Sequence, residues 1–539
     1  MSAAEQQSAV LRPWRGLGNW NLFFIFEFAL AAFGYLELNI LCNALLIAVL
    51  LCPLRGVLHG LRDLAAFAAA AALLYSESWL PGIDSLLANR QAVAGFSTRY
   101  MMELAWDFLN FRMIGWAALA AAVYFLVRSY VRVSFFTIAW FIVTAATPWW
   151  EAMQTPAVPE DTAAEKQTAA SGPAPRGAAD ARTVDEWYAA FLNYEKERRA
   201  ELPHGLSEKD TPFDILLLSI CSLSNDDLAA SQLDAHPVFS RFNIRFDRFN
   251  SATGYSGPAV LRLLNGACGQ PSHNDLYGER RTECELLTRL GTLGYKERVL
   301  MDHPGEYDSF LQSLRDKAGL TAPLESASRP FPVRYMGFDD EPISDDLSVL
   351  RWWQRTQVRS KDPRTVTLMN FISLHDGNRL PRHGRSEPFK PRAKQLLDDL
   401  ERFMTELERS GRRVMLVVVP EHGAAVRGDR IQAPRLRDIP SLRITEVPVL
   451  VKFFGLKGLP AEPIHVSGNT SYLALTTLIG KTLGANYYGR KGGAVPLEEL
   501  VKDLPQTNPV SENGQAQVLE YKGREYFRQK GGDWKLYQH

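Results

Sequence analysis

The sequence lacks a net charge. Its 60 lysines and arginines are matched by 60 aspartates and glutamates, so no global field points to nucleic acid, and we expect no nucleic-acid partner. Large apolar residues are almost absent between residues 154 and 182, where Ala, Pro, Glu, Lys and Gly dominate. A segment of this composition cannot bury enough apolar surface to fold, so we interpret residues 153–183 as a flexible linker.

Long apolar runs are missing from most of the chain and gather in its first 150 residues. Their flanks alternate between arginine-containing and arginine-poor, and the positive-inside rule then places the N-terminus in the cytoplasm and the C-terminal part outside. We predict a multi-pass transmembrane anchor over residues 1–152, with four spans as the alternative to five, and a surface helix within residues 82–106. The five stretches, each near the ~17–25 residues that a span needs, are 19–36, 38–53, 63–80, 112–128 and 133–150.

The remaining residues, 184–539, have the composition of a globular domain. Within them, apolar runs without polar alternation alternate with amphipathic segments at 394–408 and 471–483. This order predicts an α/β domain of the alkaline-phosphatase type, with a mostly parallel sheet and helices on both faces. The tail from residue 510 has the alternation of a terminal hairpin. The four expected parallel strands are residues 214–221 and 365–375, a strand that starts at Val414, and residues 446–454.

Titratable side chains follow these strands where they stop. Cys221 and His375 end two of them, and Glu421 and His422 follow the strand that starts at Val414. Because the carboxyl ends of parallel strands meet at one edge of a sheet, the four side chains are expected to converge there. The alternative for Glu421 and His422 is a hydrogen-bonded loop pair without a ligand.

The five cysteines differ in their surroundings. Cys42 and Cys52 lie in predicted spans and are interpreted as small apolar residues. Cys268 and Cys284 flank a polar loop of the exported domain, where an oxidising compartment favours a disulfide. Cys221 is left unpaired, and a metal ion would occupy its thiol. Thiolate, imidazole and carboxylate together form a zinc-type ligand set, and a buried structural cysteine is the alternative.

Ser256 lies in a glycine-rich turn ahead of an aliphatic helical segment, with Pro258 in the expected first turn. A hydroxyl at a helix N-terminus lies beside free backbone N–H groups, which stabilise an alkoxide and attract phosphate. The alternative is that Ser256 only caps the helix. Ser251 and Thr253 are rival hydroxyls upstream of the turn.

Several motifs carry a family resemblance. A first strand that ends in a metal ligand, a hydroxyl that opens a helix, and a late strand that ends in an acid and a histidine resemble the alkaline phosphatase superfamily. The anchored, exported arrangement is similar to its phosphoethanolamine transferase branch. The segments most similar to the bacterial cellulose phosphoethanolamine transferases are SICSLSNDDL at 219–228, FNSATGYSGP at 249–258, FISLHDGNRLP at 371–381, VVPEHGAAVRGD at 418–429 and LRDIP at 436–440.

The resemblance implies transfer of phosphoethanolamine from phosphatidylethanolamine to the glucose 6-hydroxyls of cellulose. It implies a multi-pass protein of the bacterial inner membrane with a periplasmic catalytic domain, acting with components of a cellulose synthase complex. Cys221 departs from the broader branch, in which the first ligand is acidic. The implied roles are Zn²⁺ binding by Cys221, Glu421 and His422, nucleophile and fourth ligand for Ser256, action near the leaving or attacking oxygen for His375, and phosphoryl or acceptor contact for Tyr255 and Arg437.

Two other functions stay open at this point. The domain is a metal-dependent phosphodiesterase or sulfatase if water takes the place of the sugar acceptor. It is a non-catalytic membrane scaffold for exopolysaccharide synthesis if it binds no metal.

Overall fold

The structure is a computed structural model, and it describes most of the chain. The described residues are 16–32, 36, 38–54, 56–78, 95–107, 111–154, 183–360, 362–382, 384–489 and 495–537. Residues 155–182, nearly all of the predicted linker 153–183, lie outside them.

The chain divides into two compact units. One comprises residues 1–87 and 102–163, and the other comprises residues 88–101 and 164–539. The predicted boundaries at residues 152 and 183 stay a prediction. Residues 82–94 of the predicted surface helix 82–106 lie outside the described residues, and α7 (Thr98–Asp107) covers the end of that range. A short described stretch of the predicted anchor, residues 95–101, thus packs with the C-terminal unit.

In the described part of the first unit, five apolar helices lie at the five predicted stretches. Among the described residues, only α4 is long and apolar enough to cross a membrane, so five spans are not confirmed. The helices α2 and α3 have 13 and 12 residues, fewer than the ~20 that cross a hydrocarbon core. The five helices are α2 (Trp20–Ala32), α3 (Ile40–Leu51), α4 (Val57–Glu77), α8 (Phe111–Val127) and α9 (Val133–Gln154).

The second unit is built on a seven-stranded mixed sheet with the order β3-β6-β1-β7-β8-β2-β9. The strands β3, β6, β1 and β7 pair in parallel, as do β2 and β9, which confirms the mostly parallel sheet. The strands are β1 (Asp214–Ile220), β2 (Ile244–Asn250), β3 (Lys296–Met301), β6 (Thr365–Phe371), β7 (Val414–Pro420), β8 (Glu446–Phe454) and β9 (Ile464–Thr470).

The strand at 446–454 was expected to be parallel, and this prediction is wrong. β8 runs antiparallel to both β7 and β2. Its near-continuous apolar run reflects burial on both faces, which does not depend on strand direction. Between β7 and β8 the chain forms one short helix, α18 (Leu442–Thr445), and no crossover helix, so the segment 421–445 lies at the carboxyl edge of β7. The reversal therefore adds a long loop to the predicted functional edge.

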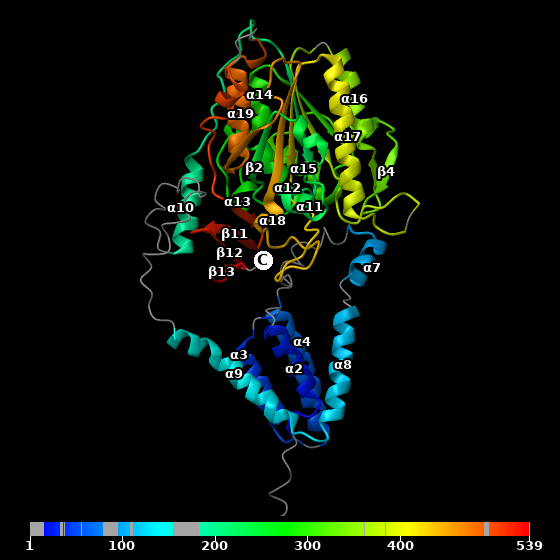
Figure 1. Cartoon of the computed structure of the whole chain (residues 1–539), viewed down its shortest axis with the longest axis vertical. Helices are drawn as coiled ribbons and strands as arrows, with labels where there is room; N and C mark the ends of the chain where they lie inside the picture. Colours follow the sequence, from blue (N-terminus) through cyan, green and yellow to red (C-terminus); the bar gives the residue numbers. More distant parts are fainter. Residues whose placement is uncertain are drawn as a thin grey trace, which may run out of the picture. The chain divides into compact units, whose positions relative to one another are not determined.

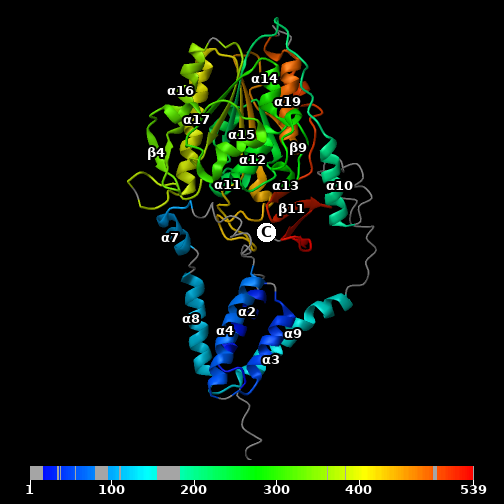
Figure 2. The ribbon, with the colours of Figure 1, turned by 180° about the vertical axis from the view of Figure 1, so that it is seen from behind.

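Helices cover both faces of this sheet, as expected. Figures 1 and 2 show α16 (Asp346–Arg359) and α17 (Phe389–Ser410) on one face, and α14 (Leu286–Thr292) and α19 (Tyr472–Gly484) on the other. Each face has its own apolar core, because alternate residues of β1 point to opposite sides: Leu216 and Leu218 join one cluster, and neighbouring strand residues join the other. The segments 394–408 and 471–483 are confirmed as parts of α17 and α19.

The tail forms a small four-stranded antiparallel sheet instead of a single hairpin. It packs against α10 (Val184–Glu197) through a separate apolar cluster that includes Trp187, Phe191 and Leu519 (Figure 1). Its strands are β10 (Val510–Asn513), β11 (Ala516–Tyr521), β12 (Arg524–Gln529) and β13 (Lys535–Leu536).

Candidate active site

The pairing of β1 with β7 sets the first three side chains of the site. Ile220 lies opposite Pro420 in the parallel register, so Cys221 and Glu421 leave the sheet side by side, and His422 follows. One ligand atom from each of the three residues lies within 4.8 Å of the others, and all three side chains are buried. The expected convergence at this edge is therefore present for Cys221, Glu421 and His422.

Ser256 completes the cluster from a different element. It is the first residue of α12 (Ser256–Leu264), and the capping position belongs to Tyr255, so the N-cap interpretation is wrong. Its Oγ lies 3.3 Å from Cys221 Sγ and 3.2 Å from His422 Nε2. The hydroxyl thus lies at a helix N-terminus and also contacts two of the three candidate ligands.

The orientation of His422 follows from its neighbours. Its Nδ1 lies 2.8 Å from the carbonyl oxygen of Gly423, which can only accept, and 3.2 Å from Arg437 Nη1, which can only donate. The shorter contact, to the carbonyl, favours the tautomer with the proton on Nδ1. Nε2 then presents its lone pair toward Ser256 and Cys221. Burial, and next the charge of Arg437, hold the pKa of His422 well below its usual value, so the ring is neutral. A neutral imidazole with a free Nε2 is the form that binds metals.

Glu421 and Cys221 are the acidic members of the site, the two that become anions when they lose a proton. Glu421 Oε1 accepts hydrogen bonds from Ser219 Oγ at 2.8 Å and from Asn370 Nδ2. Its Oε2 is buried without a hydrogen-bond partner in the described part of the chain. Burial raises the pKa of Glu421 to about 7, and burial together with the Glu421 charge raises the pKa of the Cys221 thiol to about 12.

These four side chains fit a bound cation. A buried carboxylate oxygen without a donor is costly unless a positive charge meets it. The same small volume holds a thiol, an imidazole lone pair and a hydroxyl, and a nearby cation would reverse the burial effect that keeps the thiol protonated.

Arg437, Tyr255 and His375 surround this cluster. Arg437 Nη1 donates to Ser222 Oγ at 3.2 Å, and the Tyr255 hydroxyl donates to Asp438 Oδ1 at 2.8 Å. Burial and Arg437 lower the pKa of His375 to about 3. Among the described residues, Tyr255 and His375 form no hydrogen bond to the four clustered side chains. They are therefore neighbours of the cluster and not members of it.

Sequence reasoning missed the residues that hold Glu421 in place. Ser219 and Asn370 are buried polar residues within the apolar strands β1 and β6. A polar side chain one or two residues before the end of an otherwise apolar strand is the signal that would have identified them. Such a side chain needs a partner at the edge where the strand stops.

Asn513, at the end of β10, was missed as well. Its Oδ1 accepts from Thr253 Oγ1 at 2.9 Å and from Gly254 N at 3.0 Å. Its Nδ2 donates to the carbonyl oxygens of Arg437 at 2.8 Å and Asp438 at 3.0 Å. One buried amide thereby joins the turn before Ser256 to the loop that carries Arg437. A Cβ on Gly254 would lie 2.7 Å from the Arg437 carbonyl oxygen, so this close approach requires glycine.

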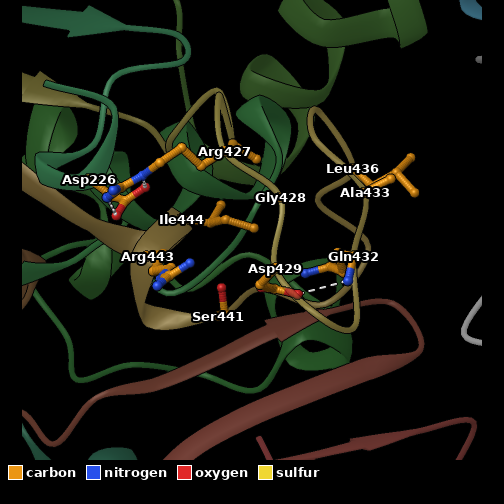
Figure 3. A pocket seen from close by; sticks show the side chains of 11 residues that line it. Asp226, Arg427, Gly428, Asp429, Gln432, Ala433, Leu436, Ser441, Arg443 and Ile444 are labelled. Carbon is orange, nitrogen blue, oxygen red and sulfur yellow. Dashed lines mark hydrogen bonds and ion pairs between the residues drawn. The ribbon is translucent and has the colours of Figure 1, made fainter. Parts of the chain in front are cut away.

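Two further features lie outside the cluster. A disulfide joins Cys268 and Cys284, as expected, with an S–S distance of 1.98 Å. A small pocket in the loop after β7 includes none of the predicted site residues. Figure 3 shows Asp226 and Arg427 turned toward one another across it, with Asp429 beside Gln432.

Both regions of the chain match a known family. The model of the cellulose biosynthesis protein BcsG C-terminal domain matches residues 168–534, and that of the BcsG N-terminal domain matches residues 20–146. Cellulose biosynthesis protein BcsG of Escherichia coli (strain K12) is 39% identical over 549 residues, which cover 98% of each chain. Cellulose biosynthesis protein BcsG of Salmonella typhimurium is 39% identical over 550 residues, with the same coverage.

Solved structures show a more distant likeness. A protein in the alkaline phosphatase superfamily from Vibrio parahaemolyticus has a TM-score of 0.46 and 11% identity, and the match covers 64% of this chain and 82% of that chain. The integral membrane protein lipooligosaccharide phosphoethanolamine transferase A from Neisseria meningitidis has a TM-score of 0.37 and 11% identity, with coverage of 90% and 87%.

Proposed function

The chain belongs to the BcsG family of cellulose biosynthesis proteins, and from this membership we propose that it transfers phosphoethanolamine from phosphatidylethanolamine to glucose 6-hydroxyls of cellulose. The observation that carries the proposal is the position of Ser256. Its hydroxyl opens α12 and lies 3.3 Å from Cys221 Sγ and 3.2 Å from His422 Nε2. A hydroxyl held between a helix N-terminus and metal-type ligands is suited to attack phosphorus.

Zn²⁺ is the proposed cofactor. Cys221, Glu421 and His422 would hold it, with Ser256 as the fourth ligand. A thiolate with an imidazole and a carboxylate selects zinc over the hard cations magnesium and calcium, which prefer oxygen ligands. When bound, the ion supplies Lewis acidity that lowers the pKa of the serine hydroxyl and offsets charge on phosphoryl oxygens.

The reaction proceeds in two displacements. Ser256 Oγ forms a bond to phosphorus while the bond from phosphorus to the diacylglycerol oxygen breaks, and the hydroxyl proton leaves with diacylglycerol. A glucose 6-hydroxyl then attacks phosphorus, the bond to Ser256 breaks, and the serine regains a proton. Arg437 binds the phosphoryl oxygens, and Asp438 fixes Tyr255 beside them. His375 donates its Nδ1 hydrogen to the Asp376 carbonyl oxygen at 2.7 Å, so its unprotonated Nε2 can accept a hydrogen bond from the leaving or attacking oxygen.

The donor is a membrane lipid and the acceptor an exported glucan, which fits a protein of the inner membrane whose catalytic domain faces the periplasm. The apolar helices of the first unit anchor the chain beside the donor, and components of a cellulose synthase complex supply the acceptor. The disulfide between Cys268 and Cys284 suits this oxidising compartment.

A product balance tests the proposal. The full chain in phosphatidylethanolamine vesicles, with zinc and a soluble cello-oligosaccharide, should release one diacylglycerol for each phosphoethanolamine attached to sugar, as measured by mass spectrometry. Free phosphoethanolamine formed equally fast with or without glucan would show a phosphodiesterase instead. A chain that binds no zinc and releases no diacylglycerol would leave only the scaffold.

Asn513→Asp should slow transfer by about 10–100-fold without loss of fold. Aspartate keeps the size and both acceptor bonds, but it loses the two donations to the carbonyl oxygens of Arg437 and Asp438 and places a charge against them. The turnover number and the thermal midpoint are the measurements. Asn243→Asp is the matched control, because this buried amide accepts from Phe453 N at 2.9 Å at the opposite edge of the sheet. Equal losses of turnover in the two variants would contradict a role for Asn513 at the site.

A further inference from the structure

Residues 96–101 lie, in the sequence, between the apolar helices α4 and α8. In the structure they pack within the same compact unit as the candidate active site. Ser97 N donates to the carbonyl oxygen of Phe338 at 2.9 Å, which fixes the start of the segment. The Tyr100 hydroxyl donates to Asp376 Oδ2 at 2.9 Å, and the Tyr100 side chain is buried.

A close approach makes this contact specific. Gly377, which follows Asp376, has φ +83°, and a Cβ there would lie 2.7 Å from the Tyr100 ring. Only glycine adopts this backbone conformation without strain and leaves room for the ring. The loop after β6 is therefore shaped to receive Tyr100.

Aromatic rings continue the contact as far as His375. The ring of Phe338 lies against the His375 ring with centroids 4.2 Å apart, and the Tyr100 ring lies 6.2 Å from Phe338. Phe96 meets Phe338 edge to face at 5.6 Å and stacks with Tyr307 at 6.3 Å. Phe338 thus covers one face of the His375 imidazole, and Phe96 and Tyr100 pack against Phe338.

Asp376 contacts both His375 and Tyr100. Its backbone carbonyl accepts from His375 Nδ1, and its carboxylate receives the Tyr100 hydroxyl and lies 3.5 Å from Arg435 Nε. The carbonyl fixes the tautomer of His375, and the carboxylate contacts fix the peptide that bears this carbonyl. Displacement of Asp376 would turn the ring and redirect Nε2.

We propose that Tyr100 is a positioning residue for His375, acting through Asp376 and Phe338, and that residues 96–101 form part of the wall of the active site. The inference rests on the proposed transferase function. It adds that the site is completed by a segment that lies, in the sequence, between the apolar helices α4 and α8.

Tyr100→Phe in the full chain tests the proposal, because it removes only the hydrogen bond to Asp376. In the vesicle and cello-oligosaccharide assay, kcat should fall about tenfold, with KM for the oligosaccharide and bound zinc unchanged. Tyr130→Phe is the matched control, since this tyrosine is 89% exposed in the turn between α8 and α9 and should retain full kcat.

A second background separates positioning from general stability. If Tyr100 acts through His375, then Tyr100→Phe should cause no further loss of kcat in a His375→Ala chain. The same tenfold loss in both backgrounds, or full kcat for Tyr100→Phe alone, would overturn the proposal. Failure of the transferase function itself has a different signature, because the wild-type chain would then attach no phosphoethanolamine to the oligosaccharide.

Discussion

Ser256→Ala should abolish transfer, with a fall in turnover of at least about 10⁴-fold, as expected when a covalent nucleophile is removed. The methyl group fills the start of α12 without strain, so the fold should persist. Three candidate ligands remain, and bound zinc should still be measurable by metal analysis of the purified chain. Mass spectrometry of the sugar product provides the activity measurement, and trapping of phosphoethanolamine on the wild-type serine gives a direct signal that the variant should lack.

Ser251→Ala is the control for this change. Ser251 is a buried residue in the same turn region. In the described part of the chain, its Oγ forms a single hydrogen bond, a long one of 3.4 Å to the carbonyl oxygen of Thr253. Loss of so long a bond should change turnover by less than about threefold. Retained transfer in Ser256→Ala, or an equal loss in both variants, would exclude Ser256 as the nucleophile.

The strand ends of the site were predictable because burial and topology act locally. Apolar runs without alternation located β1, β6 and β7, and the carboxyl ends of parallel strands meet at one edge. Cys221, Glu421 and His422 therefore converged as expected. The direction of β8 was not predictable in this way, since a strand buried on both faces has the same pattern whether it is parallel or antiparallel.

The supports of the site depend on contacts between segments far apart in the sequence. Asn513 lies 257 positions after Ser256 and Tyr100 lies 276 positions before Asp376, and each is an ordinary polar residue in its own surroundings. Nothing in the sequence near them indicates the partner, because register and loop closure set these contacts. Ser219 and Asn370 are intermediate cases, since a polar residue inside an apolar strand at least signals the need for a partner.

Zinc binding should release one proton per ion at pH 8. Burial holds the Cys221 thiol at a pKa of about 12, so the free site is protonated there and the thiolate forms only on binding. The apparent association constant should then rise about tenfold per pH unit between pH 8 and 10. Below pH 7 the Glu421 carboxyl, with a pKa of about 7, is protonated in the free site, so zinc binding releases a second proton. The slope of the logarithm of the association constant against pH should then approach two. His422 is already neutral and contributes none.

Cys221→Ala should remove this dependence together with the metal. Loss of a direct ligand should weaken zinc binding by more than the 10–100-fold that loss of an outer partner causes, and transfer should stop. Above pH 8 the residual affinity should be flat, because the thiol that supplied the proton is gone. Chelator-buffered zinc titrations at several pH values measure both effects, and Cys42→Ala, which removes an exposed thiol of the first unit, is the control. If the wild-type association constant for zinc did not change with pH above pH 8, or if Cys221→Ala bound zinc tightly, the thiol would be excluded as a ligand. The buried cysteine would then be a structural residue, and the acidity of Ser256 would need another source.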